Sequence, residues 1–207
     1  CLFLSTKNVT RTGFSFLECQ FISKEKDQKL RKGCISIGDI IITTRGTVGN
    51  IAYFDHSIPY EKIRINSGMA ILQNQTKIIS QNYFYHLLKS PVIIRQLKRL
   101  QYGSAVPQLT IGTINQLKLL IPSLPEQQKI ATILSNVDNL IESTGKVITH
   151  SKKVKTGLMQ KLLTRGIGHV TFKKVPWLFG KEIEIPEEWE VKRLDDVAHI
   201  QRGKCSH

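Results

Sequence analysis

The side chains best suited to chemistry in this sequence are cations, amides and hydroxyls that can contact phosphates and bases. In the loop RGTVG (45–49), the glycines would let the backbone approach a nucleic acid, while Arg45 and Thr47 supply hydrogen-bond donors. The same loop equally suits a plain hairpin turn between two strands. Gln108 carries the amide groups that pair with adenine, although a solvent-facing role fits it as well.

Further candidate contacts are spread over the first 122 residues. Tyr102 could stack on a base or lie in the core, and Arg64 is a weaker candidate that is first of all a surface residue. The predicted nucleic-acid contacts are Lys7, Asn8, Arg45, Gly46, Thr47, Arg64, Lys98, Arg99, Tyr102, Ser104 and Gln108.

No catalytic or metal-binding motif accompanies these residues in the sequence. There is no phosphate-binding G-x-x-x-x-G-K-[ST] loop, no G-x-S-x-G elbow, no H-E-x-x-H helix and no Asn/Asp-Pro-Pro-aromatic tetrapeptide for a methyl donor. The six histidines are scattered, and the four cysteines lack C-x-x-C spacing. We therefore expect no catalytic residue, metal or cofactor, and reduced thiols in a cytoplasmic protein.

The charge distribution points to a polyanionic partner. The chain carries a net charge of +14, of which +10 belongs to residues 1–122, +4 to 123–165 and zero to 166–207. A cationic domain gains affinity for a polyanion by releasing condensed counterions. The alternative is a basic surface that only confers solubility.

The elements that would position these side chains form a mixed α+β domain over residues 1–122. β-branched and apolar runs predict strands, and apolar residues at helical spacing after Ser80 predict two helices separated at Ser90-Pro91. The predicted strands are 36–44, 50–54, 68–72 and 116–122, and the predicted helices are 80–90 and 91–103.

A long helix is predicted over residues 123–166. Ser123 and Glu126 form an S-x-x-E capping box, and apolar residues then recur in a heptad pattern up to Arg165-Gly166. At about 1.5 Å per residue, such a rod of about 60 Å cannot bury its stripe alone and calls for a second helix. The alternative is a helix folded back on its own domain. The predicted helix-pairing residues are Ile130, Ile133, Val137, Leu140, Val147, Val154 and Leu158.

Residues 167–207 read as a linker and the beginning of another domain. The segment IPEEWEVKRLDDVAHIQRGK (185–204) suggests a turn, a strand and a glycine turn. With no run of 18 apolar residues and no cleavable leader at Cys1, we expect neither a membrane span nor a signal peptide.

These features together resemble the specificity subunit of type I restriction-modification systems. The resemblance is carried by QLTIGTINQLKLLIPSLPEQQKIATILSNVDNLIE (108–142), KTGLMQKLLT (155–164), IPEEWEVKRLDDVAHIQRGK (185–204) and GDIIITTRGTVGN (38–50). It implies a target recognition domain at 1–122 that lacks its first strand, a conserved spacer helix at 123–166, and the start of a second recognition domain at 167–207.

The resemblance also implies function and partners. Such subunits are non-catalytic and bind a split target in double-stranded DNA, and their paired antiparallel helices space the two domains and dock methyltransferase subunits, which a restriction subunit can join. The order of segments here resembles a circularly permuted half subunit or a gene fragment. A half subunit would pair with a second copy of itself and exchange residues 184–204.

Two other functions fit the sequence. One is the recognition fragment of a fused methyltransferase or endonuclease, which binding of a methyl donor would reveal. The other is a coiled-coil adaptor without DNA affinity, which a salt titration of DNA binding would distinguish.

Overall fold

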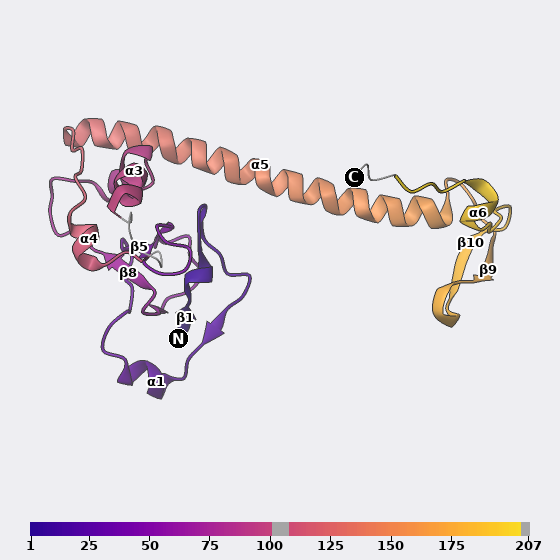
Figure 1. Cartoon of the computed structure of the whole chain (residues 1–207), viewed down its shortest axis with the longest axis horizontal. Helices are drawn as coiled ribbons and strands as arrows, with labels where there is room; N and C mark the ends of the chain where they lie inside the picture. The colour runs from indigo at the N-terminus through magenta and orange to yellow at the C-terminus, as the bar shows by residue number, and fades with distance from the viewer. Residues whose placement is uncertain (101–107, 204–207) are drawn as a thin grey trace. The chain divides into compact units, whose positions relative to one another are not determined.

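A computed structural model describes residues 1–100 and 108–203 of the chain (Figure 1). The chain divides into two compact units, Cys1–Asp138 and Asn139–His207. None of the helices in the described residues has the length and apolar content that crossing a membrane requires. The α+β class predicted for the chain is confirmed, including its long helix.

Two three-stranded sheets form the body of the first unit. In one, β1 (Leu2–Leu4) lies between β4 (Gln20–Phe21), which is antiparallel to it, and β7 (Ile63–Ile65), which is parallel. In the other, β5 (Ile40–Thr43) lies between β6 (Ile51–Tyr53) and β8 (Met69–Leu72), both antiparallel to it. A small ribbon pairs β2 (Val9–Thr10) with β3 (Gly13–Phe14).

The central strand β5 is buried on both faces. Because side chains alternate along a strand, Ile40 and Ile42 enter one apolar cluster and Ile41 enters a second. The first cluster contains the helices α2 (Gln81–Leu88) and α3 (Pro91–Leu100), and the second contains residues of β1, β6 and β7. The run of three isoleucines thus divides the core between two layers.

Local sequence explains where the helices of this unit begin. Ser23, Ser80 and Thr110 each accept a backbone N–H in the first turn of α1 (Lys24–Lys29), α2 and α4 (Ile111–Asn115) respectively. A 3₁₀ turn, η1 (Thr6–Asn8), follows β1.

The strand predicted at 116–122 is wrong, because its backbone is bound by side chains instead of a neighbouring strand. The amide of Gln96 accepts from Lys118 N and donates to Lys118 O, each at 2.9 Å, and the Tyr83 hydroxyl donates to Leu120 O at 2.8 Å. This irregular segment leads into α5 (Leu124–Arg165), which confirms the predicted long helix.

Gln127 attaches the start of α5 to the first unit. Its side chain is fully buried and accepts from Ser80 N at 2.7 Å while donating to Ile78 O at 2.9 Å and Pro122 O at 2.8 Å. Ala131, one turn later, is buried in the cluster with Ile42. A polar side chain and a small apolar one therefore hold the first two turns of the helix.

Hydroxyl side chains along α5 bond to their own helix. Each donates to the carbonyl four residues earlier, at 2.6 to 3.0 Å, and the six residues are Thr132, Ser143, Thr144, Thr149, Thr156 and Thr164. A Ser or Thr side chain within a helix can bond in this way to the carbonyl of the preceding turn.

The second unit contains the end of α5 and a hairpin. The hairpin pairs β9 (Phe172–Pro176) with β10 (Glu182–Pro186) through η2 (Leu178–Gly180), and α6 (Leu194–Val197) follows. The strand predicted after Trp189 is wrong, since the described residues there form this short helix and irregular chain. Gly166, at a φ of +63°, provides the predicted glycine stop of α5.

Candidate nucleic-acid interface

The loop between β5 and β6 is a tight hairpin turn. Thr43 Oγ1 accepts the N–H of Asn50 at 2.9 Å, and Gly49 donates to Thr43 O at 2.9 Å. Gly46 and Gly49 adopt φ values of +70° and +86°, which disfavour any residue with a Cβ. The predicted hairpin is confirmed, and it presents Arg45, Gly46 and Thr47 to solvent.

Two other segments hold this loop in place. The backbone N–H groups of Thr44 and Arg45 donate to Gly68 O at 2.7 and 3.2 Å. A Cβ on Gly46 would lie 3.3 Å from Thr6 Oγ1, and one on Gly68 would lie 2.7 Å from Thr6 Cγ2. Glycine is therefore favoured at 46 by the backbone conformation of the turn and at 68 by close packing against Thr6.

Several predicted contacts meet around the loop. Lys7 is exposed next to Thr6, and Leu109 N donates to Thr44 O at 2.9 Å, which brings the exposed Gln108 to the same neighbourhood. We call the exposed set Lys7, Arg45, Gly46, Thr47 and Gln108 the glycine-loop face.

The end of α3 borders this face. The Leu97 side chain lies 3.8 Å from the position of a Cβ on Gly49, and the next two residues, Lys98 and Arg99, are exposed. Tyr102 and Ser104 lie outside the described residues. The segment that contains them joins α3 to Gln108.

Asn8 does not belong to the interface, because its side chain is buried and bonds to nearby backbone groups. It is buried, and its amide donates to Ser15 O at 3.0 Å and Glu18 O at 2.8 Å while accepting from Ser5 N at 3.0 Å. All of these bonds form within the first turns of the domain, so we remove Asn8 from the predicted contacts.

Arg64 is likewise withdrawn from the interface. It is 8% exposed, and its guanidinium binds the Asp27 carboxylate, Asp27 O at 3.0 Å and Lys32 O at 2.9 Å. Hydrogen bonds from Lys62 and then Arg64 lower the pKa of Asp27 below its usual value. No local pattern predicts this ion pair, because its partners are 37 residues apart.

Ser135, His86 and Asp138 lie in an order that superficially suggests a nucleophile, a base and an orienting acid. His86 Nε2 is 2.9 Å from Ser135 Oγ, but Asp138 Oδ2 is 3.9 Å from Nδ1, beyond hydrogen-bond range. The Asp138 side chain is also 48% exposed. The contacts instead join α2 to the fourth turn of α5.

The described residues offer no ready metal site. Within residues 1–100 and 108–203, no three His, Cys, Asp or Glu side chains gather as a metal ion would require. Cys1, Cys19 and Cys34 are free thiols, and Cys205 is outside the described residues.

The first residue of the predicted pairing stripe of α5 differs in its surroundings from the other six. Ile130 packs against the core of its own unit and is therefore unavailable for pairing in this arrangement. The remaining six have exposed fractions of 45 to 67%, and they are Ile133, Val137, Leu140, Val147, Val154 and Leu158.

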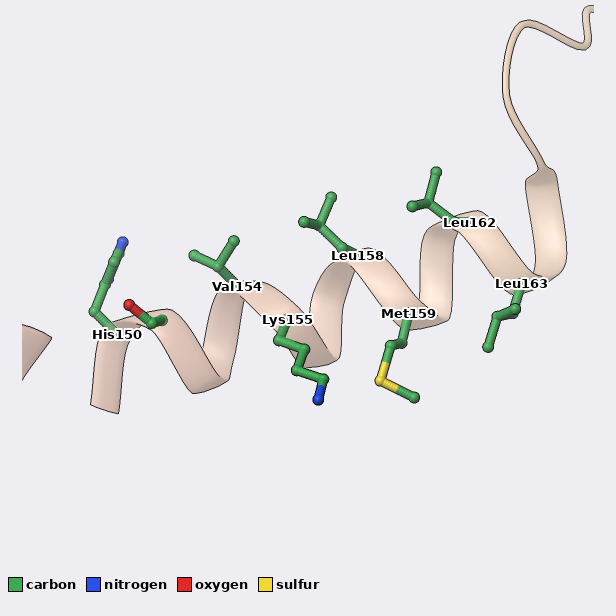
Figure 2. Close-up of a pocket in the computed structure, with 8 residues that line it drawn as sticks. His150, Val154, Lys155, Leu158, Met159, Leu162 and Leu163 are labelled. Atoms are coloured by element: carbon green, nitrogen blue, oxygen red, sulfur yellow. The ribbon is translucent and has the colours of Figure 1, made fainter. Parts of the chain in front are cut away.

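Figure 2 shows the C-terminal part of this stripe as two rows of side chains on one helix. Val154, Leu158 and Leu162 point to one side, and Met159 and Leu163 point to the other. The hollow between the rows is lined by α5 alone. One helix cannot enclose a small molecule, but such a hollow is the kind of surface that a neighbouring helix fills.

The sequence of this domain matches a known family. Residues 5–150 match the model of the type I restriction modification DNA specificity domain. The chain belongs to this family. The match contains the glycine-loop face, every strand of the two sheets except β1, and α5 up to residue 150, so the glycine-loop face lies in a specificity domain.

Among curated relatives, the chain is 39% identical over 142 residues to the type I restriction enzyme MjaVIII specificity subunit of Methanocaldococcus jannaschii. That alignment covers 68% of this chain and 32% of the relative. The MjaIX specificity subunit of the same organism is 32% identical over 80% of this chain and 37% of its own length. The chain thus spans about a third of the length of these relatives.

Solved structures share the fold of the specificity domain. A chain from work on complex assembly and conformational transition of the type I R-M system matches 84% of this chain and 46% of its own, with a TM-score of 0.55 and 18% identity. The HsdS subunit from Thermoanaerobacter tengcongensis gives a TM-score of 0.53 with the same identity and coverage.

Proposed function

We propose that the chain acts as a sequence-specific DNA-binding specificity subunit that directs methyltransferase and restriction subunits to a split target. In this role it has no catalytic residue of its own. The observation that carries the proposal is the glycine-loop face, where cationic, hydroxyl and amide side chains surround a rigid turn on a domain of charge +10. Rigid positioning of such donors is what reading base edges requires.

Replacement of Arg45 by Ala tests this interface. If Arg45 reads a guanine, the variant loses about 1–3 kcal/mol of binding free energy and accepts other bases at that position. The measurement is reconstitution with methyltransferase subunits, followed by mapping of the modified sites and titration of target DNA. Arg31→Ala is the matched control, because it removes the same charge from an exposed residue after α1.

Two different results would contradict two different parts of this proposal. Equal affinity and an unchanged modified sequence in Arg45→Ala would remove this loop from the interface. Turnover of DNA by the purified chain with a methyl donor or Mg²⁺ would contradict the non-catalytic role.

We further propose that the exposed stripe of α5 pairs with an antiparallel helix, from a second copy of the chain or from a second such segment. Support comes from the charges of the two halves of α5. Residues 124–142 carry a net −2, whereas residues 143–165 carry a net +6. An antiparallel pair would place opposite charges side by side, whereas a parallel pair would align like charges.

A further inference from the structure

The C-terminal half of α5 holds cations that its own unit does not neutralise. Residues 143–165 contain six Lys and Arg and no Asp or Glu. Lys146 pairs with Glu142 at 2.6 Å and Arg165 with Glu184 at 3.0 Å. Among residues 143–165, all of which the structure describes, the four exposed cations without an ion pair are Lys152, Lys153, Lys155 and Lys161.

The helix dipole does not account for these charges. Cations at a helix C-terminus are favoured only within about the last turn, which covers Arg165 but not Lys152, Lys153 or Lys155. Successive side chains are turned by about 100°, so Lys152 and Lys153 face different directions. Lys155 borders the apolar hollow in Figure 2, whereas Lys153 lies on the opposite side by helical position. If another helix covered the stripe, some of these cations would therefore still be exposed to solvent.

Pairing also leaves an excess of positive charge. In an antiparallel pair, the half carrying +6 would face a half carrying −2, so most of the cations stay uncompensated. A chain that only needed to pair its helices would have no electrostatic reason to retain this excess.

We propose that residues 143–165 bind the sugar–phosphate backbone of duplex DNA without reading its sequence. This inference rests on the proposed DNA-binding function and adds a second contact surface to it. Five of the six cations are lysines, whose ammonium groups act as flexible point charges and can bind phosphates without a fixed geometry. The helix offers one cation for about every 6 Å of its length, against a duplex with one phosphate for about every 1.7 Å.

The test compares two triple variants of the full chain. Lys152→Gln, Lys153→Gln and Lys161→Gln remove three cations from the helix, whereas Lys174→Gln, Lys181→Gln and Lys192→Gln remove three exposed cations after it. Binding to a random-sequence duplex of about 40 bp is followed by fluorescence anisotropy from about 0.05 to 0.2 M KCl. Each lost phosphate contact makes the slope of log K against log salt shallower by about 0.9, so the helix variant should lose about 1 to 3 in slope, according to how many of the three lysines contact the duplex.

The expected result is this loss in the helix variant, an unchanged slope in the control, and no competition by polyglutamate. An unchanged slope in the helix variant, or an equal loss in both variants, overturns the inference. If an acidic protein without DNA displaced the duplex, the surface would be assigned to a protein partner, and the inference would also be overturned. A flattened slope in the helix variant with no effect of Arg45→Ala would retain this surface and refute the glycine-loop interface alone.

Discussion

The first two turns of α5 and the turns that follow have the same apolar spacing but opposite surroundings. In the first two turns, Gln127 and Ala131 are buried and Ile130 packs on the core. Further along, Ile133 is 63% exposed and Leu140 is 67% exposed. Periodicity identifies the apolar face of a helix but not what covers that face. Here the domain itself covers the beginning and leaves the remainder exposed.

The largest effect should follow from breaking the attachment at Gln127. Gln127→Leu keeps the volume but leaves Ser80 N, Ile78 O and Pro122 O without their partner, at about 1–3 kcal/mol for each buried group. We expect the free energy of unfolding of the first unit to fall by about 3 kcal/mol or more. Urea denaturation followed by far-ultraviolet circular dichroism measures it.

The neighbouring Gln128 supplies the control for this change. It is exposed, and Gln128→Ala should alter the free energy of unfolding by less than about 0.5 kcal/mol. If Gln127→Leu were as mild as this control, the attachment would depend on apolar packing alone.

A second substitution tests the uncovered part of the helix. Leu140→Asp should leave the folding of the first unit unchanged, because Leu140 lies outside that unit and its side chain is 67% exposed. It should weaken helix pairing by about tenfold or more, since a carboxylate would replace about 1.5–3 kcal/mol of apolar burial. Sedimentation equilibrium over a range of concentrations measures the association.

Asn139→Asp adds the same charge to an exposed position outside the stripe and should leave association intact. A wild-type chain that stayed monomeric at every concentration would contradict pairing with a second copy.

A smaller, pH-dependent effect should mark where the attached part of α5 ends. Burial lowers the pKa of His86 beneath its ordinary 6.5, Asp138 acts in the opposite direction, and Lys89 adds to the lowering. Because the folded state then binds the proton less readily than the unfolded state, this contribution to stability is present above pH 6.5 and declines below it.

His86→Gln keeps a polar side chain beside Ser135 and should flatten the pH dependence of the free energy of unfolding between about pH 7.5 and 5.5. Urea titrations at both pH values measure this. The lowered pKa of Asp27 acts nearer its ordinary 3.8 and does not interfere. An identical pH dependence in the variant would show that the contact with α5 does not depend on the charge of His86.

The sequence predicted the elements whose signals are local. The isoleucines of β5, the glycine turn after it, the serine cap of α2 and the heptads of α5 all lie within short windows, and all four elements are confirmed. Two residues predicted at the surface are buried by their partners, which are 32 and 37 residues away for Arg64 but within 10 residues for Asn8. Asn and Arg are residue types that are common at protein surfaces, yet Asn8 and Arg64 are buried here by their hydrogen-bond partners.

Gln127 is a buried, fully bonded residue that the sequence did not single out, again because some of its partners are distant in the chain. Its position in PEQQK suggested only the entry to a helix, because its partners Ser80 and Ile78 lie more than 45 residues earlier. No local pattern distinguishes it from Gln128, which is exposed. Only the packing of α5 on the first unit separates the two neighbours.

The inward hydroxyl bonds of α5 have a consequence for recognition between helices. Thr144 belongs to the heptad seam, but its hydroxyl proton is already given to Leu140 O at 2.8 Å. The residue therefore presents chiefly a methyl group to a neighbour, and its polarity is concealed. At this position the seam offers no donor that could favour one alignment over the next. Selection of the correct neighbour then falls to the contrast in charge between the two ends of the helix, which makes fidelity of assembly a property that salt can erode.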